Sequence, residues 1–345
     1  MAGTMIEGAG RGPVVCFGEL LLRLSPPAGT PLSRTHDLDL AVGGAEANVA
    51  IALANLGVPT RMVSAVPDNP LGHRALAALG EAGVERAFVK QAAGRMGAYF
   101  FEPPSGPIAG RVTYDRADSA FVKTTPADLD FAEALEGASL LHLSGITPAL
   151  GEHGVALAEA AVSAAKEASV PVCFDGNYRA NLWDAWDSDP RAILSHLVEH
   201  ATILIGNHRD ISLLLGRTFS GEGPDRRREA AEAAFDRFPT LKVIASTARH
   251  MESGTANGLA ARIDLRDTHW QTDEIRIAPI VDRIGTGDAF AAGVLLRWLE
   301  GGSAQEMAET GLALAVMKHG IPGDSIAVTR DDLENFNLGG SDVRR

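Results

Sequence analysis

The ten residues VDRIGTGDAF, Val281–Phe290, place a threonine between two glycines and follow them at once with an aspartate. The residues that come next are spaced for the apolar face of a helix, at Phe290, Val294 and Trp298. This spacing predicts that three residues occupy the N-terminus of that helix: Gly285, Thr286 and Gly287. Free N–H groups and the helix dipole favour an anion there, and Asp288 in the same turn can accept a proton from a hydroxyl. The stretch therefore predicts a site that passes a phosphoryl group to an alcohol, with a simple helix cap by Asp288 as the alternative.

A second glycine-rich stretch, VGGAEANVAIALANLG, covers Val42–Gly57. Gly43 and Gly44 precede a helical pattern, and Asn48 lies on its first turn. Glycine amides and an asparagine amide can bind the hydroxyls of a sugar, although a plain strand–turn–helix connection gives the same pattern. Neither GxxxxGK[ST] nor GxGxxG occurs in the chain, so the two common nucleotide fingerprints are absent.

Outside these stretches, short apolar runs alternate with helical ones. The runs that read as buried strands are 14–18, 61–66, 140–145, 171–177, 202–207 and 242–247. The helical stretches between them include 45–56, 71–82, 151–168 and 224–238. This alternation predicts an α/β fold whose central sheet is mostly parallel and covered by helices on both faces.

Two segments break the alternation, at about 19–42 and 97–122. Both read as extended strands with polar alternation and Gly/Pro turns. We expect them to form a small second sheet that serves as a lid, as a dimer contact, or as both. The ends, 1–13 and 339–345, are expected to be flexible.

Composition narrows the classes of function. The 345 residues carry a formal net charge of −13, which argues against nucleic acid as a partner because phosphate contacts need a basic surface. No apolar run is long enough to span a membrane, and the N-terminus lacks the apolar segment of a secretory signal. Cys16 and Cys173 lie in apolar runs and are expected to be buried, reduced thiols. The expected location is the cytoplasm.

The two glycine-rich stretches, in this order and at this separation, resemble the two signature regions of the ribokinase-like (PfkB) carbohydrate kinases. The likeness runs from about Val14 to Leu333. It implies one kinase domain, 14–338, built as a three-layer α/β/α sandwich with a mostly parallel central sheet and a small β-sheet lid. Within the family the chain most resembles the 2-keto-3-deoxygluconate kinases, in the stretches HLSGITPAL, FDGNYRANLW, STARHMESGTANGLAARI and KHGIPGD.

The resemblance implies roles for individual residues on the sugar side. Asp288 would be the catalytic base, and the transferring phosphoryl would lie in an anion hole made by Gly285, Thr286 and Gly287. The residues that would bind the sugar acid are Gly43, Gly44, Asn48, Tyr99, Tyr114, Arg116, Arg179 and Asp288. Arg179 would lie near the reacting end of the sugar. A guanidinium can fork onto a carboxylate, so Arg116 and Arg179 favour an acidic substrate, and the residues leave open which of them meets its carboxylate.

On the nucleotide side the resemblance implies ATP and Mg²⁺. The residues expected beside the triphosphate or ribose are Asn207, Ser246, Thr247, Gly254, Gly285 and Gly287, and those near the adenine are Lys318 and His319. Asp210 stands where relatives carry a glutamate and would reach Mg²⁺ through a water molecule. Relatives often bind a monovalent cation near the residue matching Asp282, but the positive charge of Arg283 argues against K⁺ activation here.

The implied reaction is the ATP-dependent phosphorylation of the primary hydroxyl of 2-keto-3-deoxygluconate, giving 2-keto-3-deoxy-6-phosphogluconate, a step of Entner–Doudoroff type sugar-acid metabolism. Three alternatives stay open: a 2-keto-3-deoxygalactonate kinase, a fructokinase, and a non-catalytic sugar-binding protein on the same fold. The exposed edges of a small lid sheet further predict a homo-oligomer in which lids pair.

Overall fold

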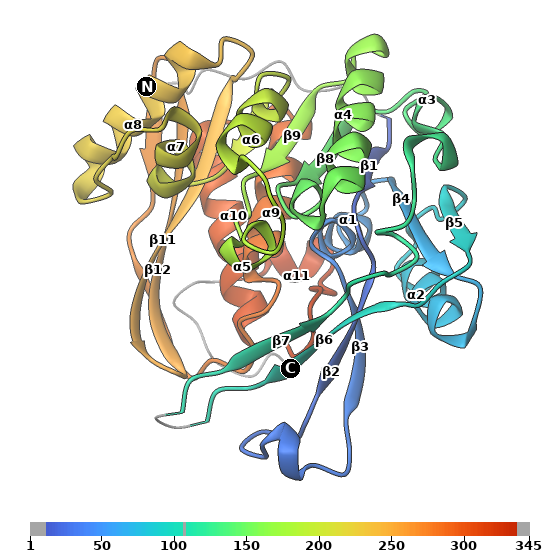
Figure 1. The fold of residues 1–345 in the computed structure, drawn as a ribbon. Coiled ribbons are helices and arrows are strands. Elements are labelled where there is room, and N and C mark those ends of the chain that lie inside the picture. Colours follow the sequence, from blue (N-terminus) through green and yellow to red (C-terminus); the bar gives the residue numbers. More distant parts are fainter. Residues whose placement is uncertain (1–11, 106–107, 337–345) are drawn as a thin grey trace.

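The computed structural model of the chain describes residues 12–105 and 108–336. Its apolar strands form one large sheet in the order β13-β12-β11-β10-β9-β8-β1-β4-β5, with β14 beside β12 (Figure 1). The bounds of these strands are β1 Val14–Phe17, β4 Thr60–Pro67, β5 Val89–Ala92, β8 Leu140–Ser144, β9 Val172–Asp175, β10 Ile203–Ile205, β11 Val243–Ser253, β12 Ala256–Leu265, β13 His269–Gln271 and β14 Ile275–Ile277.

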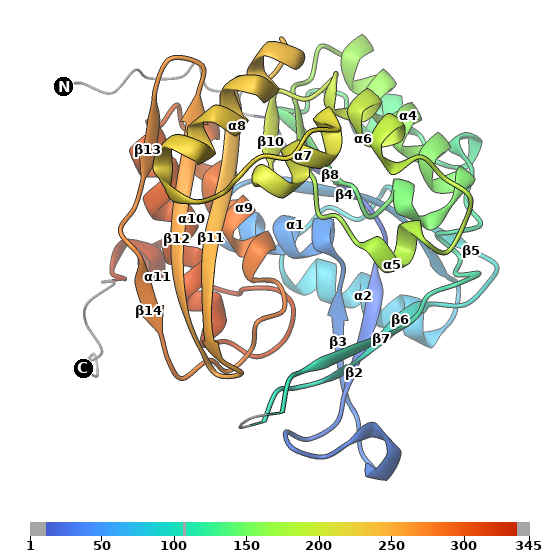
Figure 2. The same cartoon turned by 60° about the vertical axis from the view of Figure 1, so that its left-hand side comes forward.

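All neighbours from β11 to β5 are parallel, as expected for buried strands joined by helical crossovers. The six strands predicted from apolar runs are present as β1, β4, β8, β9, β10 and β11. One edge was not predicted: β11 continues to Ser253 and turns back as β12, which pairs antiparallel with β11, β13 and β14. This long β11–β12 hairpin reaches beyond the parallel strands towards the second sheet (Figures 1 and 2).

Helices cover both faces of the large sheet and produce two apolar cores. One face carries α1 Ala45–Asn55, α2 Pro70–Glu81, α9 Thr286–Leu299, α10 Ala304–His319 and α11 Arg330–Glu334. The other carries α3 Phe131–Ala134, α4 Glu152–Glu167, α5 Ala180–Trp183, α6 Pro190–Val198, α7 His208–Leu215 and α8 Gly223–Arg237. Short 3₁₀ turns lie at Leu32–Arg34, Pro126–Asp128 and Pro148–Leu150. The four helices predicted from periodicity correspond to α1, α2, α4 and α8.

The helix that begins in the GTGD stretch is held tightly against its neighbour α10. A Cβ added to Gly293 of α9 would lie 2.7 Å from the Cα of Gly311 on α10, and one added to Gly311 would lie 2.7 Å from the Phe290 ring. Glycines therefore allow the two backbones to approach closely. Because this contact lies within the first turns of α9, it fixes where the N-terminus of α9 points.

The segments that broke the alternation form a four-stranded sheet in the order β3-β2-β6-β7, called the lid below. Its strands are β2 Leu21–Ser25, β3 Asp39–Gly43, β6 Gly97–Glu102 and β7 Arg111–Asp115. The β2–β6 pair is parallel, whereas β2–β3 and β6–β7 are antiparallel. The lid projects from the open end of the large sheet (Figure 2). Leu21, Tyr99 and Phe101 of the lid pack with Ile284, so the lid contacts the loop that leads into α9.

Three further expectations concern the chain as a whole. Cys16 and Cys173 are buried free thiols, as predicted. In residues 12–105 and 108–336, no helix has the length and apolar character needed to cross a bilayer. Of the predicted flexible ends, residues 1–11 and 339–345 lie outside the described residues.

Candidate functional site

A cavity of about 820 Å³, called the central cavity below, lies where the carboxyl ends of β9, β10 and β11 meet the N-termini of α1 and α9 beneath the lid. Residues from segments far apart in sequence meet in its wall. The predicted site residues that line it are Gly44, Asn48, Tyr99, Tyr114, Arg116, Arg179, Asn207, Asp210, Ser246, Thr247, Gly285, Thr286, Gly287 and Asp288. Most of the residues that were predicted to bind the sugar or the phosphate thus line the central cavity.

Asp288 occupies the first turn of α9 and faces the first turn of α1. The amide Nδ2 of Asn48 donates a hydrogen bond of 2.6 Å to its Oδ2. Burial raises the pKa of Asp288 to about 6, and the hydrogen bond from Asn48 opposes that rise. A carboxylate with a pKa just below neutrality is ionised at pH 7 yet basic enough to take a proton from a hydroxyl. Asn48, predicted as a sugar ligand, therefore also orients the predicted base.

The two glycines of the GTGD stretch are needed for different reasons. Gly285 is the N-cap of α9 in the left-handed region, with φ of 75°, and an added Cβ would lie 1.7 Å from the carbonyl oxygen of Asp324. Gly287 has an ordinary helical backbone, and a Cβ there would meet no protein atom within 4 Å. Since Gly287 lines the central cavity, its missing side chain keeps the helix N-terminus open to a ligand.

The lid supplies two tyrosines and an arginine to the cavity wall. The hydroxyl of Tyr99 donates to the carboxylate of Asp324, and the Tyr114 ring lies 6.2 Å from the Tyr99 ring. Arg116 is buried and donates through Nε (2.9 Å) and Nη2 (2.5 Å) to Oε2 of Glu19. Arg116 is therefore an already compensated charge, which the sequence did not reveal.

Arg179 differs from Arg116 in this respect. Among the described residues its guanidinium has no ion-pair partner, and it lines the central cavity from the segment that follows β9. Its positive charge acts on the carboxyl groups of Asp175, Asp210 and Asp288. Arg179 thus lies on the side of the predicted base, while Arg116 lies on the side of the lid.

Four predicted residues do not reach the central cavity. Gly43 packs against Asp324, since an added Cβ would lie 2.0 Å from that carboxylate, and Gly254 lies in the turn of the β11–β12 hairpin. Lys318 and His319, predicted beside the adenine, are both buried at the end of α10. Lys318 Nζ donates to the Ile321 carbonyl (2.8 Å), and His319 Nδ1 bonds to the Ala315 carbonyl (2.6 Å). Both side chains therefore bond to backbone carbonyls inside the protein, and neither lines the central cavity.

The charge next to Asp282 also differs from the expectation. Arg283 points to the β11–β12 hairpin, where its Nη2 donates to the Ser253 carbonyl (2.7 Å). The cation beside Asp282 is instead Arg23 of the lid, whose Nη1 lies 2.7 Å from Asp282 Oδ2 and 3.1 Å from Asp324 Oδ1. The chain thus supplies a positive charge to these two buried carboxylates from a residue that the sequence did not single out.

At the carboxyl end of β10, Asn207 caps α7 together with Asp210. The Asn207 N–H donates to Asp210 Oδ2 (2.8 Å), and the Arg209 N–H donates to Asn207 Oδ1 (2.8 Å). Asp175, at the end of β9, lines the cavity beside them, and its Oδ1 accepts from the Asn177 N–H (3.0 Å). Burial raises the pKa of Asp175 and of Asp210, and for Asp175 the neighbouring carboxylates add to the rise. Two carboxylates close together in this wall are a pair that favours a cation.

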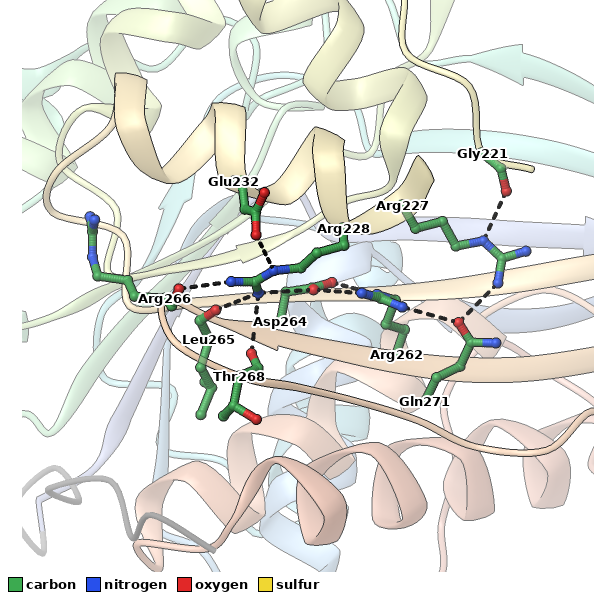
Figure 3. Close-up of polar contacts among 10 residues, drawn as sticks. All are labelled: Gly221, Arg227, Arg228, Glu232, Arg262, Asp264, Leu265, Arg266, Thr268 and Gln271. Carbon is green, nitrogen blue, oxygen red and sulfur yellow. Dashed lines mark hydrogen bonds and ion pairs between the residues drawn. The ribbon is translucent and has the colours of Figure 1, made fainter. Parts of the chain in front are cut away.

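A second hollow of about 670 Å³, called the side cavity, adjoins the central cavity below α8. The two share six lining residues: Gly206, Asn207, Arg209, Ser246, Thr247 and Arg249. Several residues that line the side cavity belong to a network of hydrogen bonds and ion pairs (Figure 3). Arg262 forks onto Asp264 with distances of 2.7 and 2.8 Å, and Arg227 donates to Gln271 Oε1 (3.1 Å). These arginines are already engaged by groups of the protein.

Asp175, Arg249 and Asp324 are among the residues that line the central cavity without having been predicted from the sequence. Asp175 and Asp324 lie inside the stretches FDGN and IPGD, and each follows an apolar run or a turn near a strand or helix end. Arg249 follows the apolar run 242–247, so its signal is a basic residue just beyond the carboxyl end of a parallel strand. The partners of Arg23 and Arg116 carry no local signal, because they lie 259 and 97 residues away along the chain.

Known proteins resemble this chain over most of its length. The family model described as pfkB family carbohydrate kinase matches residues 12–329. The chain is 35% identical over 331 residues to the 2-dehydro-3-deoxygalactonokinase of Haloferax volcanii, covering 95% of this chain and 97% of the relative. It is 26% identical over 336 residues to the 2-dehydro-3-deoxygluconokinase of Bacillus subtilis, covering 93% and 94%.

Among solved structures, the 2-dehydro-3-deoxygluconokinase of Thermotoga maritima matches with a TM-score of 0.89 and 34% identity, covering 94% of this chain and 98% of that one. A PfkB family carbohydrate kinase of Listeria grayi matches with a TM-score of 0.87 and 35% identity, covering 93% and 98%. These matches confirm the predicted ribokinase-like α/β fold. With the family model matching most of its length, the chain belongs to the pfkB family of carbohydrate kinases.

Proposed function

We propose that the protein transfers the γ-phosphoryl group of ATP to the primary hydroxyl of a keto-deoxy sugar acid. The proposed substrate is 2-keto-3-deoxygluconate, giving 2-keto-3-deoxy-6-phosphogluconate, or its galactonate epimer. The observation that carries the proposal is the pairing of an Asn48-oriented carboxylate, Asp288, with the open N-terminus of α9 at Gly287 in one cavity. The relatives named above, kinases of both epimers, support the same class of substrate.

The charges in the wall suggest how a sugar acid lies in the cavity. The hydroxyl that reacts must lie at Asp288, so the carboxylate of the substrate lies at the opposite end, below the lid. Arg116 is there, and it uses Nε and Nη2 for Glu19, which leaves Nη1 as a donor for a carboxylate. The Tyr114 ring, 5.8 Å from the Arg116 guanidinium, covers the same end. Glu19 holds Arg116 in one orientation.

At the end of the cavity where Asp288 lies, a proton passes from the sugar hydroxyl to Asp288 and the phosphoryl group passes from ATP to the hydroxyl oxygen. Asp288 accepts the proton of the primary hydroxyl of the sugar. At the same time the oxygen of that hydroxyl forms a bond to the γ-phosphorus. The bond from that phosphorus to the bridging oxygen breaks, and ADP leaves with the electron pair. The N–H groups at the start of α9 and the charge of Arg179 stabilise the negative charge on the transferring group. Closure of the lid over the sugar would keep water from the phosphorus.

The residues present fit a magnesium ion shared with the nucleotide. Within the described ranges, no three His, Cys, Asp or Glu side chains cluster as a metal site. Asp210 and Asp175 nevertheless supply two carboxylates on the nucleotide side, and Mg²⁺ commonly takes one or two carboxylates together with phosphates and waters. When bound, the ion would neutralise phosphate charge. Asp210 and Asp175 are the residues that would hold it.

The test is ADP release with 2-keto-3-deoxygluconate, 2-keto-3-deoxygalactonate, fructose and ribose, for the wild type and for Asp288→Asn. We expect turnover with the keto-deoxy acids alone, and loss of turnover by orders of magnitude in Asp288→Asn with nearly unchanged ATP binding. Turnover with fructose or ribose would refute the proposal that the substrate is a sugar acid. Near-normal turnover of Asp288→Asn would refute the role of Asp288 as the base. If the wild type releases no ADP with any of the sugars, a non-catalytic sugar-binding protein is favoured.

A further inference from the structure

Arg249 stands at the junction of the two cavities. It lies on β11, lines both the central and the side cavity, and its Nη2 donates a hydrogen bond of 3.2 Å to Oγ1 of Thr286. Thr286 is the first residue of α9, two positions before Asp288, and its own hydroxyl donates to the Arg283 carbonyl (3.0 Å). The guanidinium of Arg249 is therefore held at the helix N-terminus that Gly287 leaves open.

Among the described residues, no acidic side chain forms an ion pair with Arg249. No carboxylate of residues 12–105 or 108–336 lies within ion-pair distance of it, although the chain carries a net charge of −13. The charge of another arginine, Arg283, acts on Arg249. Arg283 donates to the Ser253 carbonyl and to Met251 Sδ, and it forms no ion pair with a described residue. Burial and the charge of Arg283 both lower the pKa of Arg249.

The other arginines nearby show that this arrangement is specific. Arg262, on the adjacent strand β12, forks onto Asp264 (Figure 3), and Arg23 and Arg116 pair with buried carboxylates. Two neighbouring guanidinium groups without an acid repel each other, and this cost is relieved when an anion binds between or beside them. Because Arg249 contacts the first residue of α9, an anion bound to Arg249 would lie at the free N–H groups of the N-terminus of α9.

We infer that Arg249 is a catalytic residue whose guanidinium binds the transferring phosphoryl group, directly beside the N-terminus of α9. This inference rests on the proposed phosphoryl transfer. As the oxygen of the sugar bonds to the γ-phosphorus and the bond to the bridging oxygen breaks, negative charge spreads over the oxygens of that group. A planar guanidinium already fixed by Thr286 can fork onto two of them without reorganising. Arg249 would act from the nucleotide side and Arg179 from the sugar side.

The first experiment compares the wild type with Arg249→Gln and Arg249→Lys in steady-state kinetics, using whichever sugar the wild type phosphorylates. For Arg249→Gln we expect kcat to fall by about 100-fold or more, as for cationic side chains that contact a transferring phosphoryl. Arg249→Lys should keep part of the rate, because it retains the charge without the fork. Arg276→Gln is the control, since Arg276 lies nearby on β14 but pairs with Glu252 in solvent, and its kcat should stay at the wild-type value.

The second experiment needs no turnover. Binding of ADP and of a non-hydrolysable ATP analogue is measured by calorimetry without sugar. The wild type should bind the triphosphate more tightly than ADP, and Arg249→Gln should lose that preference while its affinity for ADP stays unchanged. Addition of guanidinium ion to Arg249→Ala should restore part of the rate, which a purely structural role would not allow.

The outcomes separate this inference from the proposed function. Wild-type kcat in Arg249→Gln, or an unchanged preference for the triphosphate, would overturn the role of Arg249. An equal loss of affinity for ADP and the analogue would also overturn it, because the residue would then hold another part of the nucleotide. A wild type that phosphorylates only neutral sugars would refute the proposed substrate and leave the test of Arg249 intact.

Discussion

The hydrogen bond from Asn48 to Asp288 makes the acidic limb of the pH–rate profile a direct test of the proposed base. Replacement of Asn48 by alanine removes a 2.6 Å hydrogen bond to an ionised carboxylate. The bond favours the charged form, so its loss raises the pKa of Asp288 above the value of about 6 that it has in the intact protein. Because the base works only when ionised, activity should then be lost at higher pH than in the wild type.

The size of the shift follows from the energy of the bond. A hydrogen bond to a charged group contributes about 1.5–3 kcal/mol, and each pKa unit corresponds to about 1.4 kcal/mol, so the limb should move by about 1–2 units. The wild-type limb near pH 6 would thus move to about pH 7–8 in Asn48→Ala. At pH 9 the two proteins should differ little, since Asp288 is ionised in both.

The assay is kcat/KM for the sugar acid between pH 5 and 10, with ADP measured directly by chromatography rather than by coupled enzymes that have their own pH limits. kcat/KM reports ionisations of the free enzyme, to which the pKa of Asp288 above refers. The ionisations of ATP and the sugar acid are common to all variants and cancel in the comparison. Asn55→Ala is the control, because Asn55 lies on the same helix and its amide donates to the Ile51 carbonyl instead of to Asp288. A limb that stays in place in Asn48→Ala, at any level of activity, would refute this account of the base.

Three further predictions follow from the buried charges and the lid. Burial raises the pKa of Glu46 from 4.5 to about 7, so ionisation of Glu46 lowers the free energy of unfolding as the pH rises from about 4.5 through 7. In urea unfolding, Glu46→Gln should therefore be more stable than the wild type by up to about 3 kcal/mol at pH 8 and equally stable at pH 4. Equal gains in stability at both pH values would contradict this. Since Arg23 already pairs with Asp282, turnover should be the same in K⁺ and in tetramethylammonium salts, and strong activation by K⁺ would show that this pair does not replace a bound cation. Leu40 on β3 and Val112 on β7 are exposed on the two edge strands of the lid, so light scattering should find a homo-oligomer that Leu40→Glu weakens; a wild-type monomer would remove the lid contact from consideration.

The parts of this protein that could be predicted from the sequence are those set by near neighbours in the chain. Glycines around Thr286 ahead of a helical pattern place an anion-binding N-terminus, because N–H groups at a helix start are free whatever the helix packs against. The parallel strands could be predicted because their signal also lies in consecutive residues: a strand that is buried on both faces needs a continuous apolar run. The antiparallel edge escaped prediction because β13 and β14 have only three residues each and β12 follows β11 through a short turn.

Which charges remain free to act was decided only by the tertiary structure. Arg116 and Arg179 look alike in the sequence, yet Glu19 compensates the first while the second faces the cavity without a partner among the described residues. The fold likewise decides the partner of Lys318, whose Nζ donates to the carbonyl of Ile321 inside the protein. A helix terminus is a property of a few consecutive residues, whereas the compensation of a charge depends on whatever group the fold brings within a few ångströms, from any distance along the chain. The sequence by itself therefore determined the kinase scaffold and the position of its proposed base. Only the fold determined that Arg249 lies at the N-terminus of α9, where it contacts Thr286 and forms no ion pair with any described acid.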